Sequence, residues 1–269
     1  SFLNKEFKKF IEKAGIPSAS TILGLSALES MHPLHVGMLG MHGNYGPNLL
    51  TNECDVLIAV GMRFDDRVTG DLSRYATQAK VIHLDIDPAE IDKNVKADVP
   101  VLGDCKASLV ALTHLVDERS HPEWLARFEY CRKKEHERVV LRELDGKSDE
   151  MSMAEVIHLL SDKTNGEAIL VTDVGQHQMV AQRYYQFRDY RTNVTSGGLG
   201  TMGFCLPAAM GAKLARPEKQ VLAVIGDGGF QMTVQELGTI MQSGIDVKVL
   251  ILNNEFLGMV RQWQELFFE

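Results

Sequence analysis

Two kinds of hydrophobic pattern alternate along the chain, amphipathic helical stretches and short runs that are apolar at nearly every position. The apolar runs predict strands at Asp55–Val60, Lys80–Asp85, Val99–Leu102, Ala168–Thr172, Gln220–Ile225 and Asp246–Leu252. Strands that are apolar on both faces and separated by helices are typical of a parallel sheet covered on both sides. We therefore predict an α/β fold.

Helical periodicity begins near the first residue and recurs after most of the strands. Asp104 is a suitable N-cap for a helix over Cys105–Asp117, and Pro88 favours the start of another helix. The remaining helices are expected at Asn4–Ala14, Met153–Ser161, Gln176–Tyr185, Phe204–Ala215, Thr233–Gln242 and from about Gly258. A short strand through Ala19 and Thr21 is expected after the first helix.

The composition changes over residues 119–150, which are charged and carry no strand pattern. We interpret this stretch as a linking helix followed by an exposed loop, with the basic cluster Arg132–Lys134 on a solvated helix face. A chain of 269 residues has room for two domains of ordinary size. The sequence thus predicts two doubly wound parallel-sheet domains, residues 1–118 and 151–269.

Charge and composition exclude several classes of protein. The 28 basic and 36 acidic residues give a net charge of −8, which argues against a sequence-independent nucleic-acid binder. The apolar runs are too short to cross a bilayer. The four cysteines lie far apart, so reduced thiols in a cytoplasmic protein are expected. His32, His35 and His42 lack a suitable partner ligand and are interpreted as loop residues rather than a metal site.

In the second half, polar residues follow three strands, at the edge where α/β sheets bind ligands. They are Val174–His177 (VGQH), Gly226–Gly229 (GDGG) and Asn253–Asn254. The glycines after Asp227 would let backbone N–H groups approach a phosphate. If the strands before Asp227 and Asn254 are neighbours, a carboxylate, an amide oxygen, a backbone carbonyl and phosphate oxygens would coordinate Mg²⁺. The alternative is a tight turn and a polar strand end that bind nothing.

GDGG and the Asn pair, with Asp227 and Asn254 27 residues apart, resemble the diphosphate–Mg²⁺ motif of thiamine diphosphate enzymes. Other motifs make the chain similar to the catalytic subunits of the acetohydroxyacid synthase (acetolactate synthase) family. They are Gly37–Gly43 (GMLGMHG), Gly61–Gly70 (GMRFDDRVTG), Val174–His177, Ser196–Pro207 (SGGLGTMGFCLP) and Gly258–Trp263 (GMVRQW). The GDGG and Asn–Asn motif alone indicates only the cofactor. RFDDRVTG and the Trp of GMVRQW are more specific and indicate this one family.

This resemblance implies that the second half binds thiamine diphosphate and Mg²⁺. The metal ligands would be Asp227, the Asn254 side chain and the Phe256 carbonyl. Met202 would bend the cofactor so that its 4′-imino nitrogen meets C2; the alternative role is a gap-filling core methionine. The implied contacts with thiamine diphosphate are Val174, Gly175, Gln176, His177, Gly200, Met202, Gly226, Gly228, Gly229, Gly258, Met259 and Val260.

The resemblance also implies that the first half binds FAD in a mainly structural role, although related enzymes carry this fold with no flavin or with a nucleotide. Arg63 is suited to a phosphate. The implied flavin contacts are Thr21, Ile22, Met38, Leu39, Gly40, Met41, His42, Gly61, Arg63, Asp65, Val68, Asp85, Ile86, Gly103 and Asp104.

The activity that the resemblance implies is decarboxylation of pyruvate and its condensation with pyruvate or 2-oxobutyrate, in branched-chain amino acid biosynthesis. Met259, Val260 and Trp263 would line the substrate pocket, with Trp263 favouring the larger acceptor. Arg67 would meet the acceptor carboxylate at a subunit interface, or else pair with Asp65 or Asp66. The implied partners are a second catalytic subunit, in a dimer or tetramer, and a small regulatory subunit.

Two features lead us to expect that the sequence is part of a longer enzyme. It begins at Ser1 without a signal peptide, and a helical pattern still runs at Glu269. Family members also carry a preceding domain, with a glutamate that protonates the cofactor, and a closing C-terminal segment. The first strand of the central domain is also expected to be missing. We therefore expect weak cofactor binding and little or no activity from these 269 residues alone.

Two other functions remain open. One is a different thiamine diphosphate-dependent 2-oxoacid decarboxylase, carboligase or oxidase, against which Trp263 and the RFDDR motif count. The other is a non-catalytic flavin- or nucleotide-binding module.

Overall fold

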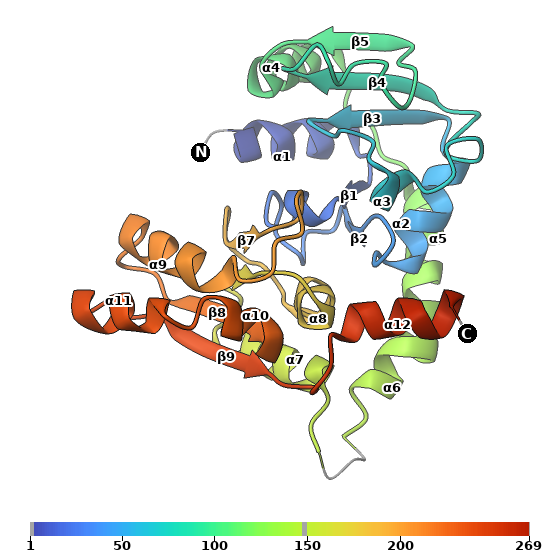
Figure 1. The fold of residues 1–269 in the computed structure, drawn as a ribbon. Helices are drawn as coiled ribbons and strands as arrows, with labels where there is room; N and C mark the ends of the chain where they lie inside the picture. Colours follow the sequence, from blue (N-terminus) through green and yellow to red (C-terminus); the bar gives the residue numbers. More distant parts are fainter. Residues whose placement is uncertain (1–2, 147–149, 269) are drawn as a thin grey trace. The chain divides into compact units, whose positions relative to one another are not determined.

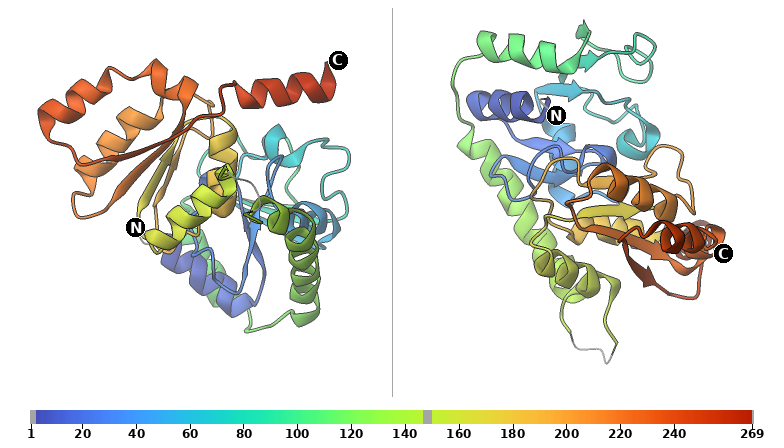
Figure 2. Two further views of the ribbon diagram at one scale, coloured as in Figure 1. Left: turned by 90° about the horizontal axis from the view of Figure 1, so that it is seen from below. Right: turned by 90° about the vertical axis from the view of Figure 1, so that its left-hand side faces the viewer.

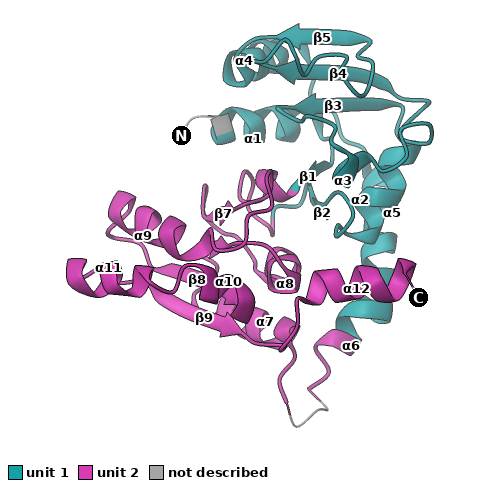
Figure 3. Ribbon diagram, viewed as in Figure 1, with its two compact units in different colours: residues 1–21, 32–141 teal, residues 22–31, 142–269 magenta. Residues whose placement is uncertain are grey.

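The computed structural model describes residues 3–146 and 150–268, and the chain divides into two compact units. One unit contains the residues up to Thr21 and His32–Leu141, and the other contains Ile22–Met31 and the residues from Arg142 onward (Figure 3). The change between the units falls inside the stretch that we interpreted as a linker. The assignment of Ile22–Met31 to the second unit has no counterpart in the sequence pattern.

The first unit contains two parallel sheets (Figure 1). β1 (Ser18–Ser20) pairs with β2 (His35–Met38), and a three-stranded sheet has the order β3-β4-β5. Its strands are β3 (Val56–Val60), β4 (Lys80–Asp85) and β5 (Val99–Leu102). These three match the predicted apolar runs, and the parallel α/β fold class is confirmed.

The helices of the first unit are short except for three. α1 (Leu3–Ala14) packs on α4 (Cys105–Leu115), and α5 (Pro122–Glu135) packs on α2 (Tyr45–Leu50). The predicted N-cap of α4 is confirmed, because Asp104 accepts a hydrogen bond from the Ala107 N–H. The shorter elements are the 3₁₀ turn Thr51–Glu53, α3 (Asp66–Thr69), the π-turn His136–Val140 and α6 (Leu141–Glu143). α6 begins at the last residue of the first unit and continues into the second.

The predicted helix start at Pro88 is wrong, because the residues between β4 and β5 form consecutive turns. The Asp87 side chain accepts a hydrogen bond from the Ala89 N–H, and the Asp92 side chain accepts one from the Ala97 N–H. Asp92 also has a positive φ of 60°. Local bonds from aspartate side chains to the backbone thus replace the helical ladder.

The second unit is a doubly wound sheet of the order β7-β6-β8-β9, with all strands parallel. The strands are β6 (Ile169–Thr172), β7 (Asn193–Thr195), β8 (Val221–Gly226) and β9 (Lys248–Leu252). β6 and β8 are buried at every position, which explains their continuous apolar runs.

Helices cover both faces of this sheet (Figure 2). α9 (Cys205–Ala215) and α11 (Glu236–Ser243) pack on one face with Val221, Ala223 and Ile225 of β8. α8 (Gln176–Tyr184) packs on β6 and β8, and α7 (Met153–Lys163) packs on α8. The remaining elements are the 3₁₀ turn Ile22–Gly24, α10 (Asp227–Met232) and α12 (Gly258–Phe267).

The predicted helix Thr233–Gln242 is wrong at its start. α10 ends at Met232 and α11 begins at Glu236, with Thr233 in a non-helical conformation at φ −134° and ψ 26°. The Thr233 hydroxyl donates a hydrogen bond to the Gly203 carbonyl at 3.0 Å, which holds the chain between the two helices. No helix in the described part of the chain has the length and apolar character needed to span a membrane.

Candidate functional site

A narrow cleft of about 90 Å³ lies at the carboxyl edge of the second sheet. β8 and β9 are neighbours, as predicted, and Gly226 is in register with Leu252, so Asp227 and Asn254 follow adjacent strand ends. The residues lining the cleft are Met153, Val174, Gly175, Gln176, His177, Met202, Gly226, Asp227, Gly228, Gly229, Leu252, Asn254, Phe256, Leu257, Gly258, Met259 and Val260. The structure therefore gathers nearly all of the predicted cofactor residues of this half.

Gly200 is the one predicted cofactor residue of this half that does not line the cleft. It adopts a positive φ of 65°, and a Cβ there would lie 3.8 Å from the Val174 side chain. Met153, Leu252 and Leu257 also line the cleft but were not predicted, because they are apolar residues outside any motif.

The glycines of GDGG lie against other cleft residues. A Cβ on Gly228 would lie 3.2 Å from Leu257 and 3.3 Å from the terminal methyl of Met202. A Cβ on Gly229 would overlap the Asp173 carboxylate. A side chain at either position would therefore crowd these neighbours. Gly229 is buried and Gly228 is half-buried, and both glycines line the cleft.

The first turn of α8 faces the same cleft through Gly175, Gln176 and His177. Gly175 is the N-cap at φ 152°, and no side chain caps this end. The N–H groups at the start of a helix attract anions. The arrangement fits a phosphate group beside the GDGG turn.

Asp227, Gln176 and Asn254 form the polar part of the cleft. The Asn254 amide donates a hydrogen bond to Gln176 Oε1 at 3.1 Å, and Asn254 Oδ1 accepts the Phe256 N–H at 3.3 Å. The described residues contain no group of three or more His, Cys, Asp or Glu side chains suited to a metal ion. A cation here would therefore need oxygens from amide, backbone and phosphate groups beside the one carboxylate, which is how Mg²⁺ is commonly held.

Asp173 is fully buried and does not line the cleft. Its carboxylate binds His177, which lines the cleft, and the backbone of Gly203, which follows the lining residue Met202. His177 Nε2 donates a hydrogen bond to Asp173 Oδ1 at 2.6 Å, and the Gly203 N–H donates to Oδ2 at 2.9 Å. The His177 side chain is itself buried. Asp173 was not predicted, although it directly follows the buried strand β6, which was the available signal.

Met202 lies in a loop held by its own hydrogen bonds. The Gly200 N–H donates to the Ser196 carbonyl, and the Thr201 N–H donates to the Ser196 hydroxyl at 2.9 Å. The Met202 side chain is half-buried, and it reaches Gly228 rather than the core cluster of this sheet. This position favours the cofactor-contacting role over the gap-filling role.

The predicted substrate-pocket residues divide on α12. Met259 and Val260 line the cleft, whereas Trp263 does not. Trp263 is 41% exposed and stacks on Phe267 with ring centroids 4.8 Å apart. None of the side chains on α12 that the structure describes is buried.

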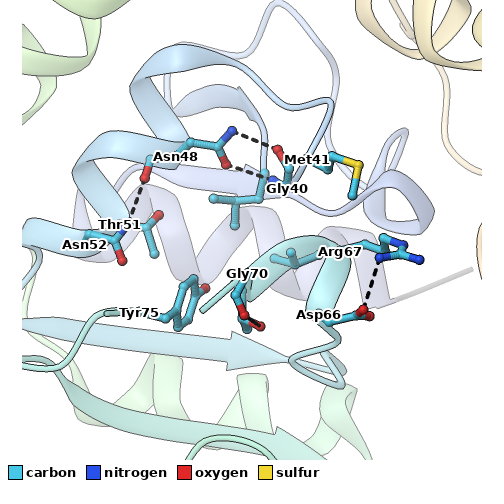
Figure 4. A pocket seen from close by; sticks show the side chains of 12 residues that line it. Gly40, Met41, Asn48, Thr51, Asn52, Asp66, Arg67, Gly70 and Tyr75 are labelled. Carbon is cyan, nitrogen blue, oxygen red and sulfur yellow. Dashed lines mark hydrogen bonds and ion pairs between the residues drawn. The ribbon is translucent and has the colours of Figure 1, made fainter. Parts of the chain in front are cut away.

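The first unit contains a separate cavity of about 320 Å³ between α2 and α3 (Figure 4). Among the residues predicted to bind flavin or substrate, Leu39, Gly40, Met41, Arg67 and Val68 line it. The other lining residues were not predicted: Asn48, Thr51, Asn52, Asp66, Thr69, Gly70 and Tyr75. They come from α2, from the 3₁₀ turn that follows it, from α3 and from the residues after α3.

Charged and polar groups around this cavity are only partly satisfied. Arg67 pairs with Asp66 at 3.1 Å, and both side chains are largely exposed, so this pair contributes little stability. The Tyr75 hydroxyl is buried without a hydrogen-bond partner among the described residues, and burial raises the pKa of Tyr75, so the phenol stays neutral. Burial and then the nearby Arg67 charge lower the pKa of His42.

Seven of the remaining predicted flavin residues lie at or after the carboxyl ends of β3, β4 and β5: Gly61, Arg63, Asp65, Asp85, Ile86, Gly103 and Asp104. Met38 is the last residue of β2, and His42 follows that strand. The Gly61 N–H donates to the Leu84 carbonyl, and the Gly103 N–H donates to the Asp85 carbonyl, both at 2.8 Å. Arg63 lies 3.9 Å from Asp65, whose side chain caps α3. Ile86 is 70% exposed at this edge. Thr21 and Ile22 fall in different units.

Two sequence models of one enzyme family match the chain. The model described as "Thiamine pyrophosphate enzyme, central domain" matches residues 3–112, and "Thiamine pyrophosphate enzyme, C-terminal TPP binding domain" matches residues 173–269. The chain belongs to the thiamine pyrophosphate enzyme family. Its C-terminal domain carries the cleft, so the cleft lies in the thiamine pyrophosphate (thiamine diphosphate) binding domain of the family.

Relatives of known name share most of this chain's length. It is 47% identical over 264 residues to the acetolactate synthase large subunit of Lactococcus lactis, covering 98% of this chain and 45% of the relative. It is 41% identical to the acetolactate synthase isozyme 3 large subunit of Escherichia coli, covering 98% and 46%. It is 44% identical to acetolactate synthase 1 of Nicotiana tabacum, covering 99% and 40%. The chain thus spans less than half the length of these relatives, and the predicted resemblance is confirmed.

Proposed function

We propose that this protein acts as a thiamine diphosphate-dependent acetolactate synthase, which decarboxylates pyruvate and joins the product to a second 2-oxoacid. The single observation that carries the proposal is the cleft at the ends of β6, β8 and β9, where Gln176, Asp227 and Asn254 converge. The similarity to acetolactate synthase large subunits over 98% of the chain supports the substrate class.

The residues of the cleft fit a diphosphate bound with Mg²⁺. We assign Asp227, the Asn254 side chain and the Phe256 carbonyl as metal ligands, since a hard cation prefers such oxygens. The start of α8 and the Gly228–Gly229 backbone would hold the diphosphate oxygens. Thiamine diphosphate, when bound, supplies the carbanion chemistry that removes CO₂ from a 2-oxoacid.

The chain's own residues orient and enclose the reacting part of the cofactor. Met202 and Leu257 both reach Gly228 in the cleft, so they form an apolar surface beside the proposed diphosphate position. Such a surface orients a bound ring and excludes water from the atoms beside it. Met259 and Val260 extend this surface along α12.

FAD is proposed for the first unit. Two observations support it: the predicted contacts Leu39, Gly40, Met41 and Val68 line the cavity, and His42 Nε2 is buried without a hydrogen-bond partner among the described residues. Arg63 would serve a phosphate at the end of β3. The flavin would have a structural role, since the proposed reaction moves no net electrons.

The substrates and partners belong to the same proposal. Pyruvate and 2-oxobutyrate are the proposed acceptors, with the Arg67 guanidinium meeting the acceptor carboxylate. A second catalytic subunit, in a dimer or tetramer, and a small regulatory subunit are the proposed partners. All four cysteines are free thiols, which agrees with the cytoplasmic location that we propose.

Calorimetric titration of thiamine diphosphate in the presence of Mg²⁺ tests the proposal. The chain should bind the cofactor, and Asp227→Ala should abolish that binding. Asp246→Ala is the matched control, because Asp246 is an exposed aspartate before β9 that pairs with Lys248 away from the cleft. Binding of FAD without thiamine diphosphate, or an Asp227→Ala variant that binds like the parent, would reject the proposal.

A further inference from the structure

Asp173 is a buried carboxylate that connects several segments of the thiamine diphosphate cleft without lining it. Its two oxygens have different partners, His177 Nε2 at 2.6 Å and the Gly203 N–H at 2.9 Å. A carboxylate buried this completely is tolerated only where donors satisfy it. It cannot hold a diphosphate itself, because both groups are negative, so any role in the cleft must act through its partners.

The first partner, His177, fills the space between two strand ends. A Cβ on Gly226 would lie 3.0 Å from His177 Nδ1, and a Cβ on Gly175 would lie 2.8 Å from the same atom. The imidazole thus lies between the residues that follow β6 and the last residue of β8. By fixing the ring, Asp173 fixes the separation of Gly175 from Gly226, which sets the width of the cleft.

The second partner, Gly203, belongs to the loop that carries Met202. Gly203 has a positive φ of 83°, and its carbonyl accepts the Thr233 hydroxyl. The Met202 methyl comes within 3.3 Å of a Cβ position on Gly228. Anchoring Gly203 on Asp173 therefore also sets how far Met202 reaches over the GDGG turn.

We propose that Asp173 is a positioning residue, which sets the width of the diphosphate cleft through His177 and the reach of Met202 through Gly203. The inference rests on the proposed function, since it names the cofactor that the cleft would hold. A third contact agrees with it: the Asp173 carboxylate lies directly against Gly229 of the GDGG turn.

The two partners differ in how they respond to a neutral replacement of Asp173. In Asp173→Asn, one oxygen remains as acceptor and the other group becomes an N–H donor. The Gly203 N–H can only donate, whereas a histidine can move its proton between Nδ1 and Nε2. The asparagine oxygen should therefore stay with Gly203, and the imidazole should switch to the Nδ1–H tautomer. Asp173→Ala removes both contacts.

The experiment compares Asp173→Ala and Asp173→Asn with the parent chain by calorimetric titration of Mg²⁺–thiamine diphosphate. We expect the dissociation constant to rise by at least about tenfold in Asp173→Ala and by no more than about threefold in Asp173→Asn, since charge-assisted contacts to buried groups are the costly ones to lose. Thr172→Val is the matched control: Thr172 is equally buried and binds Thr195 at 2.7 Å, but it does not line the cleft. The affinity of the Thr172→Val variant for Mg²⁺–thiamine diphosphate should equal that of the parent chain.

Amide hydrogen exchange and ¹⁵N NMR of His177 give readouts that need no cofactor. The Gly203 amide should lose protection in Asp173→Ala and keep it in Asp173→Asn, where the ¹⁵N shifts should show the Nδ1–H tautomer. Unchanged Gly203 protection in Asp173→Ala overturns the positioning role. Parental affinity in that variant overturns it as well.

If Asp173→Ala does not fold, His177→Ala and His177→Gln replace it. Lost affinity in His177→Ala with recovery in His177→Gln supports the proposal, and equal affinity in both overturns it. A parent chain that binds no thiamine diphosphate, yet shows the expected exchange and tautomer changes, would reject the proposed function alone.

Discussion

The side-chain amide of Asn254 donates a hydrogen bond to Gln176 Oε1 at 3.1 Å, across the carboxyl end of β8. Gln176 follows β6 and Asn254 follows β9, and these two strands flank β8 on either side. The bond therefore closes the cleft around Asp227, which directly follows β8. A Cβ on Gly258 would overlap Gln176 Oε1, so α12 begins close to the same pair.

This bond predicts that Gln176 and Asn254 are energetically coupled in cofactor binding. Gln176→Ala should weaken binding of Mg²⁺–thiamine diphosphate by about three- to tenfold, since a neutral hydrogen bond is lost. Asn254→Ala should weaken binding much more, because the proposed metal ligand is lost as well. The double variant should lose less binding free energy than the two single variants together, and the difference, the coupling free energy, should be about 0.5–3 kcal/mol. Calorimetry on all four proteins measures this cycle, and strict additivity would contradict the proposed contact.

Gly229→Ala should destabilise the protein, because its Cβ would overlap the buried Asp173 carboxylate. Overpacking of this kind costs about 1–3 kcal/mol. Gly238→Ala is the matched control: Gly238 lies in α11, and a Cβ there would meet nothing within 4 Å. That change should stabilise the protein by about 0.5–1 kcal/mol. Urea denaturation of the three proteins measures both effects, and equal stabilities would show that the Gly229 backbone can relax.

His42 should make the protein less stable as the pH falls. Burial and the Arg67 charge lower its pKa in the folded state, so the unfolded chain binds the proton more readily. The folded state is thus favoured above the unfolded pKa of about 6.5, and this contribution is lost as the pH falls through the folded value. The free energy of unfolding of the parent should fall from pH 7.5 to 5.5 more than that of His42→Gln.

The Arg67→Ala variant separates the two causes of the His42 shift. Removing the Arg67 charge should raise the pKa of His42 in an NMR titration. It should not restore the ordinary value, because burial is the larger cause of the shift. A titration midpoint that does not move would show that the Arg67 charge is screened by Asp66.

Trp263→Leu should change acceptor preference with little effect on stability. Trp263 is 41% exposed and contacts Phe267, so its replacement should change the free energy of unfolding by about 0.5 kcal/mol or less. Trp263 does not line the cleft in this structure, but we propose that it contacts the acceptor in the active enzyme. The preference for 2-oxobutyrate over pyruvate should then fall by about ten- to 200-fold, the range for one methylene in a pocket. Product analysis with both acceptors measures this ratio, and Phe267→Leu, further along α12, should leave it unchanged.

Strands and motifs were predictable wherever one physical rule governs several residues in a row. β6 and β8 are buried on both faces, so their sequences are apolar throughout, and Asp227 could be placed at a strand end. The short elements β2, β7, α2 and α3 carry too few residues for a period to show. The helix predicted to start at Pro88 is absent for a different reason, since the side chains of Asp87 and Asp92 accept backbone hydrogen bonds that compete with a helix.

The candidate site shows the same division. Gly228, Gly229 and Asn254 were predicted as ligand-binding residues from motif and spacing, because approach to a phosphate favours glycine and a hard cation prefers oxygen ligands. The structure places all three in the lining of the cleft. Asp173 belongs to no such motif, and Tyr75 and Asn52 of the first cavity follow no strand end. Their roles depend on which buried groups they meet, and that depends on contacts far apart in the chain.

The sequence by itself determined the α/β class, the GDGG and Asn–Asn motif and the family. These depend on local periodicity and on the residue types that the chemistry requires. Only the tertiary structure decided that Asn254 bonds Gln176 across β8, that His177 lies between Gly175 and Gly226, and that Trp263 is excluded from the lining of the cleft. The reason is that strand order and helix packing set these distances. Neither is encoded in the spacing of residues along the chain.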